Sequence, residues 1–248
     1  MGKVITVTSG KGGVGKTTIS ANLAAALALL GKRVLIVDTD IGLRNLDIIL
    51  GVHSIIVYDI SDVYDGKIDL FDACFKCDKY GELYFLPACQ TIDKEDIDQE
   101  AFYTFIRNVK STFDYVILDC PAGIGIGFKN ALRASDAIIT VVTPDYASIR
   151  DADRVLYCAE DLKITENYII INKFIPRLVR RGIMPNVDKI LEELGTPLLG
   201  IVYHDDEMIR FQNEGRLIID DDKRKCSKKI KNCAKRLTGE QIPVKIRM

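Results

Sequence analysis

The sequence predicts an α/β fold, a three-layer α/β/α sandwich around a mostly parallel central sheet. Short β-branched or apolar runs alternate with helical segments along most of the 248 residues. The runs are nearly continuous in apolar residues, which is typical of central parallel strands covered on both faces. Strand–helix alternation also implies parallel strands joined by right-handed crossovers. We therefore expect one P-loop-type domain over residues 1–248, with a basic helix at about 222–238.

The elements follow one another in a regular order. The apolar residues at 19, 23, 27 and 30 lie one helical turn apart, and those at 102, 105, 106 and 109 share one helix face. The predicted helices are 19–30, 101–109, 146–162, 186–194 and 223–237. The predicted strands are 4–7, 34–37, 83–86, 115–118, 137–142, 168–171 and 198–202. Ligands of such sheets bind beyond the carboxyl ends of the strands, so we expect the site there.

Composition limits the class of protein. Hydrophobic residues make up 48% and charged residues 28%, which excludes a disordered chain. No signal peptide is recognisable and no apolar run approaches the ~18 residues of a membrane span, so we expect a cytoplasmic protein. The seven cysteines suit a reducing compartment. Cys74 and Cys77 form a CxxC near Cys89, but no second pair completes a zinc site, so free structural thiols are expected.

Charge is distributed unevenly along the chain. Residues 223–248 contain ten Lys or Arg and one acid, a balance of +9. The whole chain carries −1, so residues 1–222 carry −10. A basic tail on an acidic body indicates either an anionic partner or a solvated helix face. Arg177, Arg180 and Arg181 form a second basic group, which we expect to be an exposed loop.

A glycine-rich loop follows the first predicted strand and leads directly into a helix. Its glycines let the main chain wrap a phosphate with N–H groups pointing inward, and the helix N-terminus adds a positive dipole. Lys16 is placed to reach the β- and γ-phosphates of ATP, and the Thr17 hydroxyl to ligate Mg²⁺. A turn that binds nothing is the alternative. The expected nucleotide-binding residues are Gly10, Lys11, Gly12, Gly13, Val14, Gly15, Lys16, Thr17 and Thr18.

Acidic residues follow two of the buried strands. Asp38 and Asp40 come after 34–37 and point to the same side of the chain, where they can face the loop. One can help organise the Mg²⁺ shell and the other can orient the attacking water. Asp119 follows 115–118 and is expected to hold Mg²⁺, usually through a water. Each acid alone could be a turn or helix cap.

Two further features lie near the predicted site. Asn172, which we expect just beyond the strand at 168–171, is placed to contact the adenine edge, although a turn-forming Asn is the alternative. Pro121, Ala122 and Gly123 follow Asp119 and can form a switch that senses the γ-phosphate. Mg-ATP and its product ADP are therefore the expected ligands.

A second lysine, Lys11, stands at the start of the loop, and here the sequence resembles the deviant Walker A ATPases. In that family the early lysine reaches across a sandwich dimer to the partner's nucleotide. The resemblance implies that Lys11 acts in trans, offsetting transition-state charge together with Lys16. It also implies that Asp40 positions the water while Asp38 belongs to the metal shell. A solvent-facing Lys11 is the alternative.

Three segments narrow the resemblance to the MinD branch of that family. They are Asp38–Asp47, Leu86–Thr91 with the pattern LPAxQT, and Val142–Arg154 with the pattern TPExxSxRDADR, in which Asp145 replaces the Glu. The resemblance covers about residues 2–240. It implies an ATP hydrolase that forms a homodimer on ATP, binds membrane peripherally, meets MinE- and MinC-like partners, and acts in division-site placement.

The chain departs from the MinD pattern in two places. It ends without the amphipathic membrane-targeting helix, and Pro243 suits no helix there. The loop at 202–205 lacks a proline that the family often carries near the base pocket. The basic helix could replace the anchor on an anionic bilayer, could touch DNA, or could simply pack on the domain. A ParA-type ATPase that positions DNA or cargo, and a non-catalytic nucleotide switch, are the alternative functions.

Overall fold

The computed structural model describes residues 2–40, 45–53, 55–89 and 98–246. Parts of two quoted motifs, residues 41–44 and 90–91, lie outside this range. Eight strands form one sheet in the order β3-β4-β2-β5-β1-β6-β7-β8. All neighbours are parallel except β3 and β4, which run antiparallel. The strands are β1 Lys3–Thr8, β2 Val34–Asp38, β3 Phe75–Lys76, β4 Leu83–Leu86, β5 Tyr115–Asp119, β6 Ala137–Val142, β7 Glu166–Phe174 and β8 Leu198–Tyr203.

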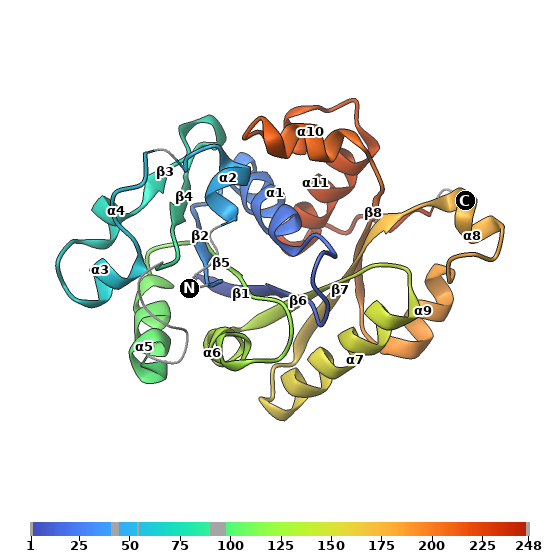
Figure 1. Cartoon of the computed structure of the whole chain (residues 1–248), viewed down its shortest axis with the longest axis horizontal. Helices are drawn as coiled ribbons and strands as arrows, with labels where there is room; N and C mark the ends of the chain where they lie inside the picture. The colour runs from blue at the N-terminus through green and yellow to red at the C-terminus, as the bar shows by residue number, and fades with distance from the viewer. Residues whose placement is uncertain (1, 41–44, 54, 90–97, 247–248) are drawn as a thin grey trace.

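Helices cover both faces of this sheet, which confirms the predicted three-layer class (Figure 1). The helices of the described residues are α1 Lys16–Leu29, α2 Leu46–Leu50, α3 Ile60–Tyr64, α4 Leu70–Ala73, α5 Gln99–Val109, α6 Ile126–Ala134, α7 Tyr146–Asp161, α8 Pro176–Arg180, α9 Val187–Leu194, α10 Glu207–Asn213 and α11 Lys225–Leu237. Alternate residues of β5 serve opposite layers. Ile117 packs with α1, whereas Val116 and Leu118 pack with α5 and α6.

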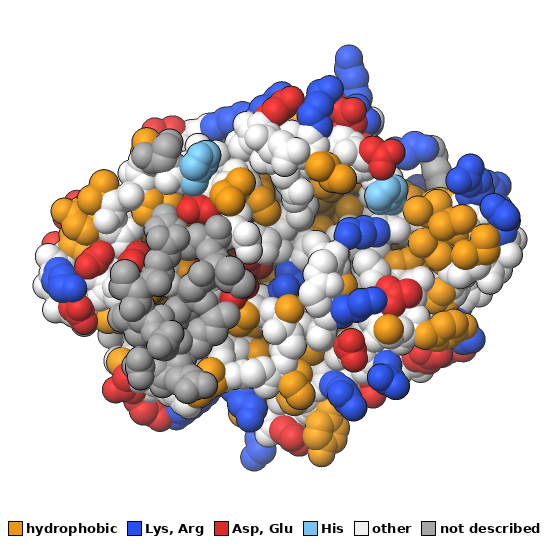
Figure 2. Space-filling view, in the orientation of Figure 1, with side chains coloured by type: hydrophobic (Ala, Val, Ile, Leu, Met, Phe, Trp, Pro, Cys, Tyr) orange, Lys and Arg blue, Asp and Glu red, His pale blue; other side chains and the backbone are white. Residues whose placement is uncertain are grey.

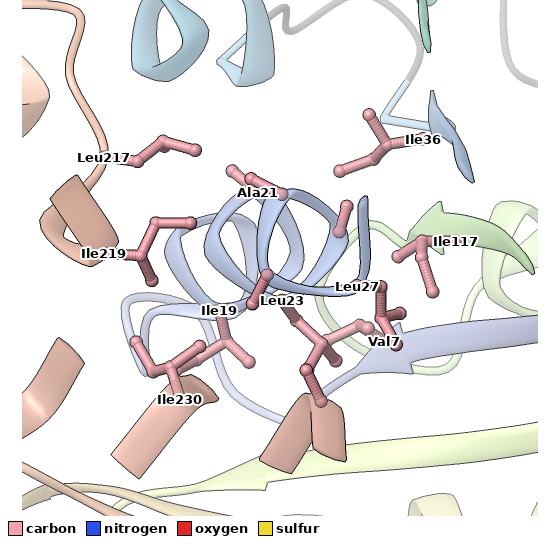
Figure 3. Close-up of a cluster of buried hydrophobic side chains, with 14 of the residues drawn as sticks. Val7, Ile19, Ala21, Leu23, Leu27, Ile36, Ile117, Leu217, Ile219 and Ile230 are labelled. Carbon is pink, nitrogen blue, oxygen red and sulfur yellow. The ribbon is translucent and has the colours of Figure 1, made fainter. Parts of the chain in front are cut away.

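Helix α1 is enclosed on every side. Residues 19–28 are all buried, since the sheet lies beneath them and α11 and the 3₁₀ turn Ile218–Asp220 lie against the other side. Figure 3 shows Ile19 and Leu23 of α1 among side chains from the sheet and from Ile219 and Ile230. A helix that is apolar all round is the kind that a protein buries completely. The phosphate loop therefore leads into a helix that is buried from residue 19 to residue 28.

The apolar stripe of the basic helix packs on the domain. Cys226, Ile230, Cys233 and Ala234 of α11 are at most 1% exposed and lie against α1 and β8. A Cβ at Gly200 of β8 would lie 2.3 Å from the Cys233 sulfur, so the strand and helix meet without a side chain between them. The stripe is therefore unavailable for insertion into a bilayer, and only the lysine-rich face of α11 meets solvent.

Other differences from the predicted elements are local. Arg177 and Arg180 lie in the short helix α8, so the predicted basic loop is wrong for these two residues. The strand β7 continues to Phe174 and includes Asn172, which was expected beyond its end. In the described part of the chain no helix combines the length and apolarity needed to cross a membrane.

Candidate nucleotide site

The phosphate loop spans the gap between the end of β1 at Thr8 and the start of α1 at Lys16. Gly13 and Gly15 have φ of 76° and 94°, values that favour glycine. A Cβ on Gly12 or Gly13 would meet nothing within 4 Å, so the loop borders open space there. A Cβ on Gly15 would lie 2.5 Å from the Asn172 amide nitrogen. The loop is therefore open toward a ligand and tightly held from behind.

Two residues of β7 hold this loop in place. The side-chain amide of Asn172 donates to the Val14 carbonyl at 2.8 Å, and the Lys173 ammonium donates to the Gly13 carbonyl at 2.7 Å. Lys173 has a φ of 55°, in the left-handed region, where β7 and β8 lose their regular register. This irregularity turns two consecutive side chains toward the loop, which an extended strand would send to opposite faces.

A pocket of about 520 Å³ opens above the loop. Its lining includes six of the predicted nucleotide-binding residues of the loop, Gly12, Gly13, Gly15, Lys16, Thr17 and Thr18. Asn172, Tyr203, His204, Met208 and Ile209 also line it, together with Asp40 and Ala122. The loop at 202–205, where a family proline is missing, thus contributes directly to the pocket wall.

The two strand-end acids Asp38 and Asp119 lie side by side behind the loop. They are register partners of β2 and β5 and each is 2% exposed. The Ser20 hydroxyl donates to Asp119 at 2.7 Å, and the Asp40 N–H donates to Asp38 at 2.9 Å. Neither acid lines the open pocket. They stand behind Thr17, whose side chain hydrogen-bonds Asp119.

Burial works against the charge on both acids. It raises the pKa of Asp119 to about 6, although hydrogen bonds from Ser20 and Thr17 and the charge of Lys16 oppose it. Burial, followed by repulsion from Asp119, holds the pKa of Asp38 well above its ordinary range. Two adjacent buried carboxylates are costly unless a cation compensates them. Their oxygens beside the Thr17 hydroxyl fit Mg²⁺, which prefers oxygen ligands and retains waters.

The remaining predicted residues lie apart from the pocket. Lys11 is 45% exposed, and its ammonium lies 3.3 Å from Asp145 at the start of α7. It does not line the pocket, and neither do Gly10 and Val14. A Cβ on Gly10 would lie 2.3 Å from the Asp151 carbonyl, so Gly10 packs the loop against α7.

Sequence reasoning missed three residues that support the site. Ser20 lies one helical turn after Thr17, a spacing that could have indicated its bond to Asp119. Gln212 of α10 hydrogen-bonds the Thr18 hydroxyl across 194 positions of the chain, and no local signal predicts it. Lys173 could have been found only by knowing the irregular end of β7. In another part of the chain, Cys74 and Cys77 are free, and burial raises the pKa of both thiols to about 12.

Comparison with known proteins decides the family. A family model described as "AAA domain" matches residues 2–171. The septum site-determining protein MinD of Bacillus subtilis (strain 168) is 44% identical over 248 residues, covering 99% of this chain and 92% of the relative. The chain belongs to the MinD family. MinD proteins are P-loop ATPases, and this chain is an ATPase of that family.

Solved structures agree with this membership. MinD in the MinC:MinD cell division protein complex of Aquifex aeolicus matches with a TM-score of 0.92 and 41% identity, covering 98% of each chain. MinD complexed with Mg-ADP from Pyrococcus horikoshii OT3 matches with a TM-score of 0.84 and 26% identity, covering 96% of each chain. The MinD assignment is thereby favoured over the ParA-type alternative.

Proposed function

We propose that this MinD-family ATPase acts as a nucleotide-controlled dimer that helps to place the division septum. The supporting observation is the single site in which the phosphate loop, Lys16 and Thr17 stand before Asp119, with Asp40 at the rim. ATP binding favours the dimer, and hydrolysis to ADP releases it. The relative crystallised with Mg-ADP supports the choice of ligand.

Each residue has a role that its position supports. Lys16 neutralises phosphate charge, and Thr17 offers its hydroxyl to Mg²⁺, with Asp38 and Asp119 behind it as outer-shell acceptors. Bound Mg²⁺ supplies charge neutralisation at the β- and γ-phosphates. Asp40 accepts a hydrogen bond from the attacking water and orients it. Asn172 fixes the loop through Val14 and borders the base end of the pocket, where it can meet the adenine edge.

Lys11 serves the nucleotide of the partner subunit in this proposal. Its exposed ammonium, outside its own pocket, is free to leave the surface ion pair with Asp145, because such pairs contribute little. A cation brought in on dimerisation would complete the site only in the ATP-bound dimer. Hydrolysis would then depend on assembly.

The roles of Asp40 and ATP are tested by turnover and molecular mass. We expect Asp40→Ala to abolish hydrolysis while ATP still yields dimers in light scattering, because the proposed role of the residue is to orient water and not to bind the phosphates. ADP should yield monomers of both proteins. Normal turnover by Asp40→Ala would remove Asp40 from this role, and monomers in ATP would contradict the dimer.

Mixed dimers test Lys11 directly. Lys11→Ala has an intact water-positioning acid but offers no lysine, whereas Asp40→Ala offers the lysine but cannot hydrolyse. If Lys11 acts across the interface, mixing the two inactive proteins restores turnover at the Lys11→Ala site, up to half of the wild-type rate per mixed dimer. If Lys11 acts within its own subunit, the mixture stays as inactive as its components.

Two kinds of partner follow from the family. The Aquifex relative is solved as a MinC:MinD complex, which supports a MinC-like partner here, with a MinE-like activator as its counterpart. A peripheral place on the inner membrane surface would use the lysine face of α11, since its apolar stripe is buried. Sedimentation with anionic vesicles in ATP and in ADP tests this, and duplex DNA as a parallel sample tests the ParA-type alternative.

A further inference from the structure

A second large depression lies at the carboxyl ends of β7 and β8, beside the nucleotide pocket. It has a volume of about 940 Å³ and runs between the start of α8, the end of β8, the first half of α11 and the segment 242–245. Figure 2 shows hydrophobic side chains gathered at this end of the molecule, with Lys and Arg side chains beside them. We call it the α8–α11 groove.

Positive charge lines the groove without compensation. Its lining contains no acidic residue. None of its six cations forms a salt bridge with any residue that the structure describes. The full set of lining cations is Arg177, Lys223, Lys225, Lys228, Lys229 and Lys245.

Neighbouring cations outside the groove behave differently. Arg224 lies 3.2 Å from Asp205 and 3.3 Å from Asp221, and Lys231 lies 2.5 Å from Asp222. The acids near the start of α11 are thus engaged by residues that do not line the groove. The positive charge of the groove cations is therefore exposed to solvent, where it can attract an anion.

The floor between these cations is apolar and fixed in place. Phe174 and Tyr203 meet edge to face with centroids 6.1 Å apart, and Pro176 and Ile242 flank them. Arg236 donates to the carbonyls of Leu199 and Ile242, both at 2.7 Å, and this holds the 242–245 segment against β8. The groove is therefore a built depression with a preformed wall.

We propose that the α8–α11 groove binds an acidic peptide segment of a partner protein, with apolar side chains on the floor and carboxylates at the lysine rim. A peptide combines both kinds of group at the spacing of single residues. A planar bilayer could touch the lysine rim but cannot follow the concave floor. The phosphates of duplex DNA would meet the lysines, but any phosphate over the apolar floor would lose water without gaining a partner.

The groove shares a wall with the nucleotide pocket. Tyr203 and His204 line both, and β7 presents Asn172 and Lys173 to the phosphate loop but Phe174 to the groove. A segment seated in the groove therefore contacts two residues that also line the nucleotide pocket. We therefore expect the affinity of the proposed partner to differ between the nucleotide-bound and the nucleotide-free protein.

The probe for this site is a dye-labelled eight-residue peptide of alternating glutamate and leucine, followed by fluorescence anisotropy with the full-length chain. We expect saturable binding that weakens with salt. Combined Lys225→Gln and Lys228→Gln should weaken it at least tenfold. The matched control is Lys231→Gln with Lys235→Gln, two changes on the same helix outside the groove lining, which should change binding less than twofold. Unchanged ATP turnover and thermal unfolding in both variants show that they fold.

Three results would overturn the proposal. One is equal loss of binding in the control variant, which would indicate general attraction to a basic helix. Another is equal binding by an all-glutamate peptide of the same net charge, which would show that the apolar floor is unused. The third is displacement of the peptide by phosphatidylglycerol vesicles or duplex DNA at lower concentration than unlabelled peptide, which would assign the surface to a membrane or to nucleic acid.

Discussion

We expect the buried carboxylate of Asp119 to lower the free energy of unfolding of the nucleotide-free protein. Burial raises its pKa from 3.8 to about 6, and each tenfold change in an ionisation constant corresponds to about 1.4 kcal/mol. The ionised carboxylate therefore costs about 3 kcal/mol of folding free energy in the absence of a cation. Asp119→Asn keeps an acceptor for Ser20 and Thr17, and its amide can donate to Asp38. We expect it to raise the free energy of unfolding by about 1–3 kcal/mol at pH 7.5.

The pH dependence of the free energy of unfolding reveals the sign of this contribution. Below the unfolded pKa of 3.8 both states are protonated at Asp119 and the cost is absent. The cost grows as pH rises from 3.8 to about 6 and is nearly constant above that, because the unfolded state ionises before the folded state. The stability difference between Asp119→Asn and wild type should therefore be largest at pH 7.5 and small near pH 4. Urea unfolding without Mg²⁺ or nucleotide, at several pH values, measures this difference.

Asp136 supplies a control of opposite sign. Burial alone would raise its pKa, but hydrogen bonds from Lys110 and from the Val4 N–H lower it below the ordinary value. Its ionised form stabilises the fold, so Asp136→Asn should lose stability, more at pH 7.5 than at pH 4. The reasoning is refuted if Asp119→Asn is no more stable than wild type at pH 7.5. It is refuted equally if its advantage does not depend on pH.

Four further substitutions, one of them also combined with Asn172→Ala, test the loop and the core. Lys163→Gly and Lys173→Gly each relieve a left-handed backbone (φ 58° and 55°), so each should raise the free energy of unfolding by up to about 1 kcal/mol. Only Lys173→Gly should weaken binding of a fluorescent ATP analogue, by tenfold or more, because Lys173 holds the phosphate loop. Equal affinities of the two variants would remove Lys173 from the site. Gly15→Ala should weaken the same binding at least tenfold through its clash with Asn172, and Asn172→Ala added to it should recover part of the loss; no recovery would assign the loss to backbone strain. Ile230→Ala should lower the unfolding free energy by about 2–5 kcal/mol in urea, and a loss under 1 kcal/mol would contradict its place in the core.

The central strands were predictable because burial on both faces gives them an unmistakable apolar pattern. The run at 137–142 matches β6, and the runs at 34–37 and 115–118 each lack only the terminal acid. That acid ends each predicted run because a charge interrupts an apolar pattern, yet its backbone still pairs in the sheet. The phosphate loop and the strand-end acids were predictable for a different reason, because binding of phosphate and Mg²⁺ requires particular residue types at particular positions.

Features set by contacts between distant residues could not be predicted. Helix α6 begins at Ile126 in a glycine-rich stretch of low helix propensity, and packing on the sheet stabilises it. The last residues of β7 pair with β8, so local sequence placed Asn172 beyond the strand. The stripe of α11, with two cysteines and an alanine, could not by itself distinguish a core surface from an exposed one. Only the position of α1 decides that question.

The enclosure of α1 by the last helix has a consequence for synthesis on the ribosome. Asn22 accepts a hydrogen bond from the Ile219 N–H, a contact 197 positions apart in the chain, and α11 closes the same side. At about 5–20 residues per second, the helix that carries the phosphate loop would wait roughly 10–40 s for its cover. During that time its apolar surface has to be shielded by collapse or by a chaperone. A nascent chain stalled before α11 should therefore be unable to retain ATP, even though every residue of the nucleotide pocket has already been made.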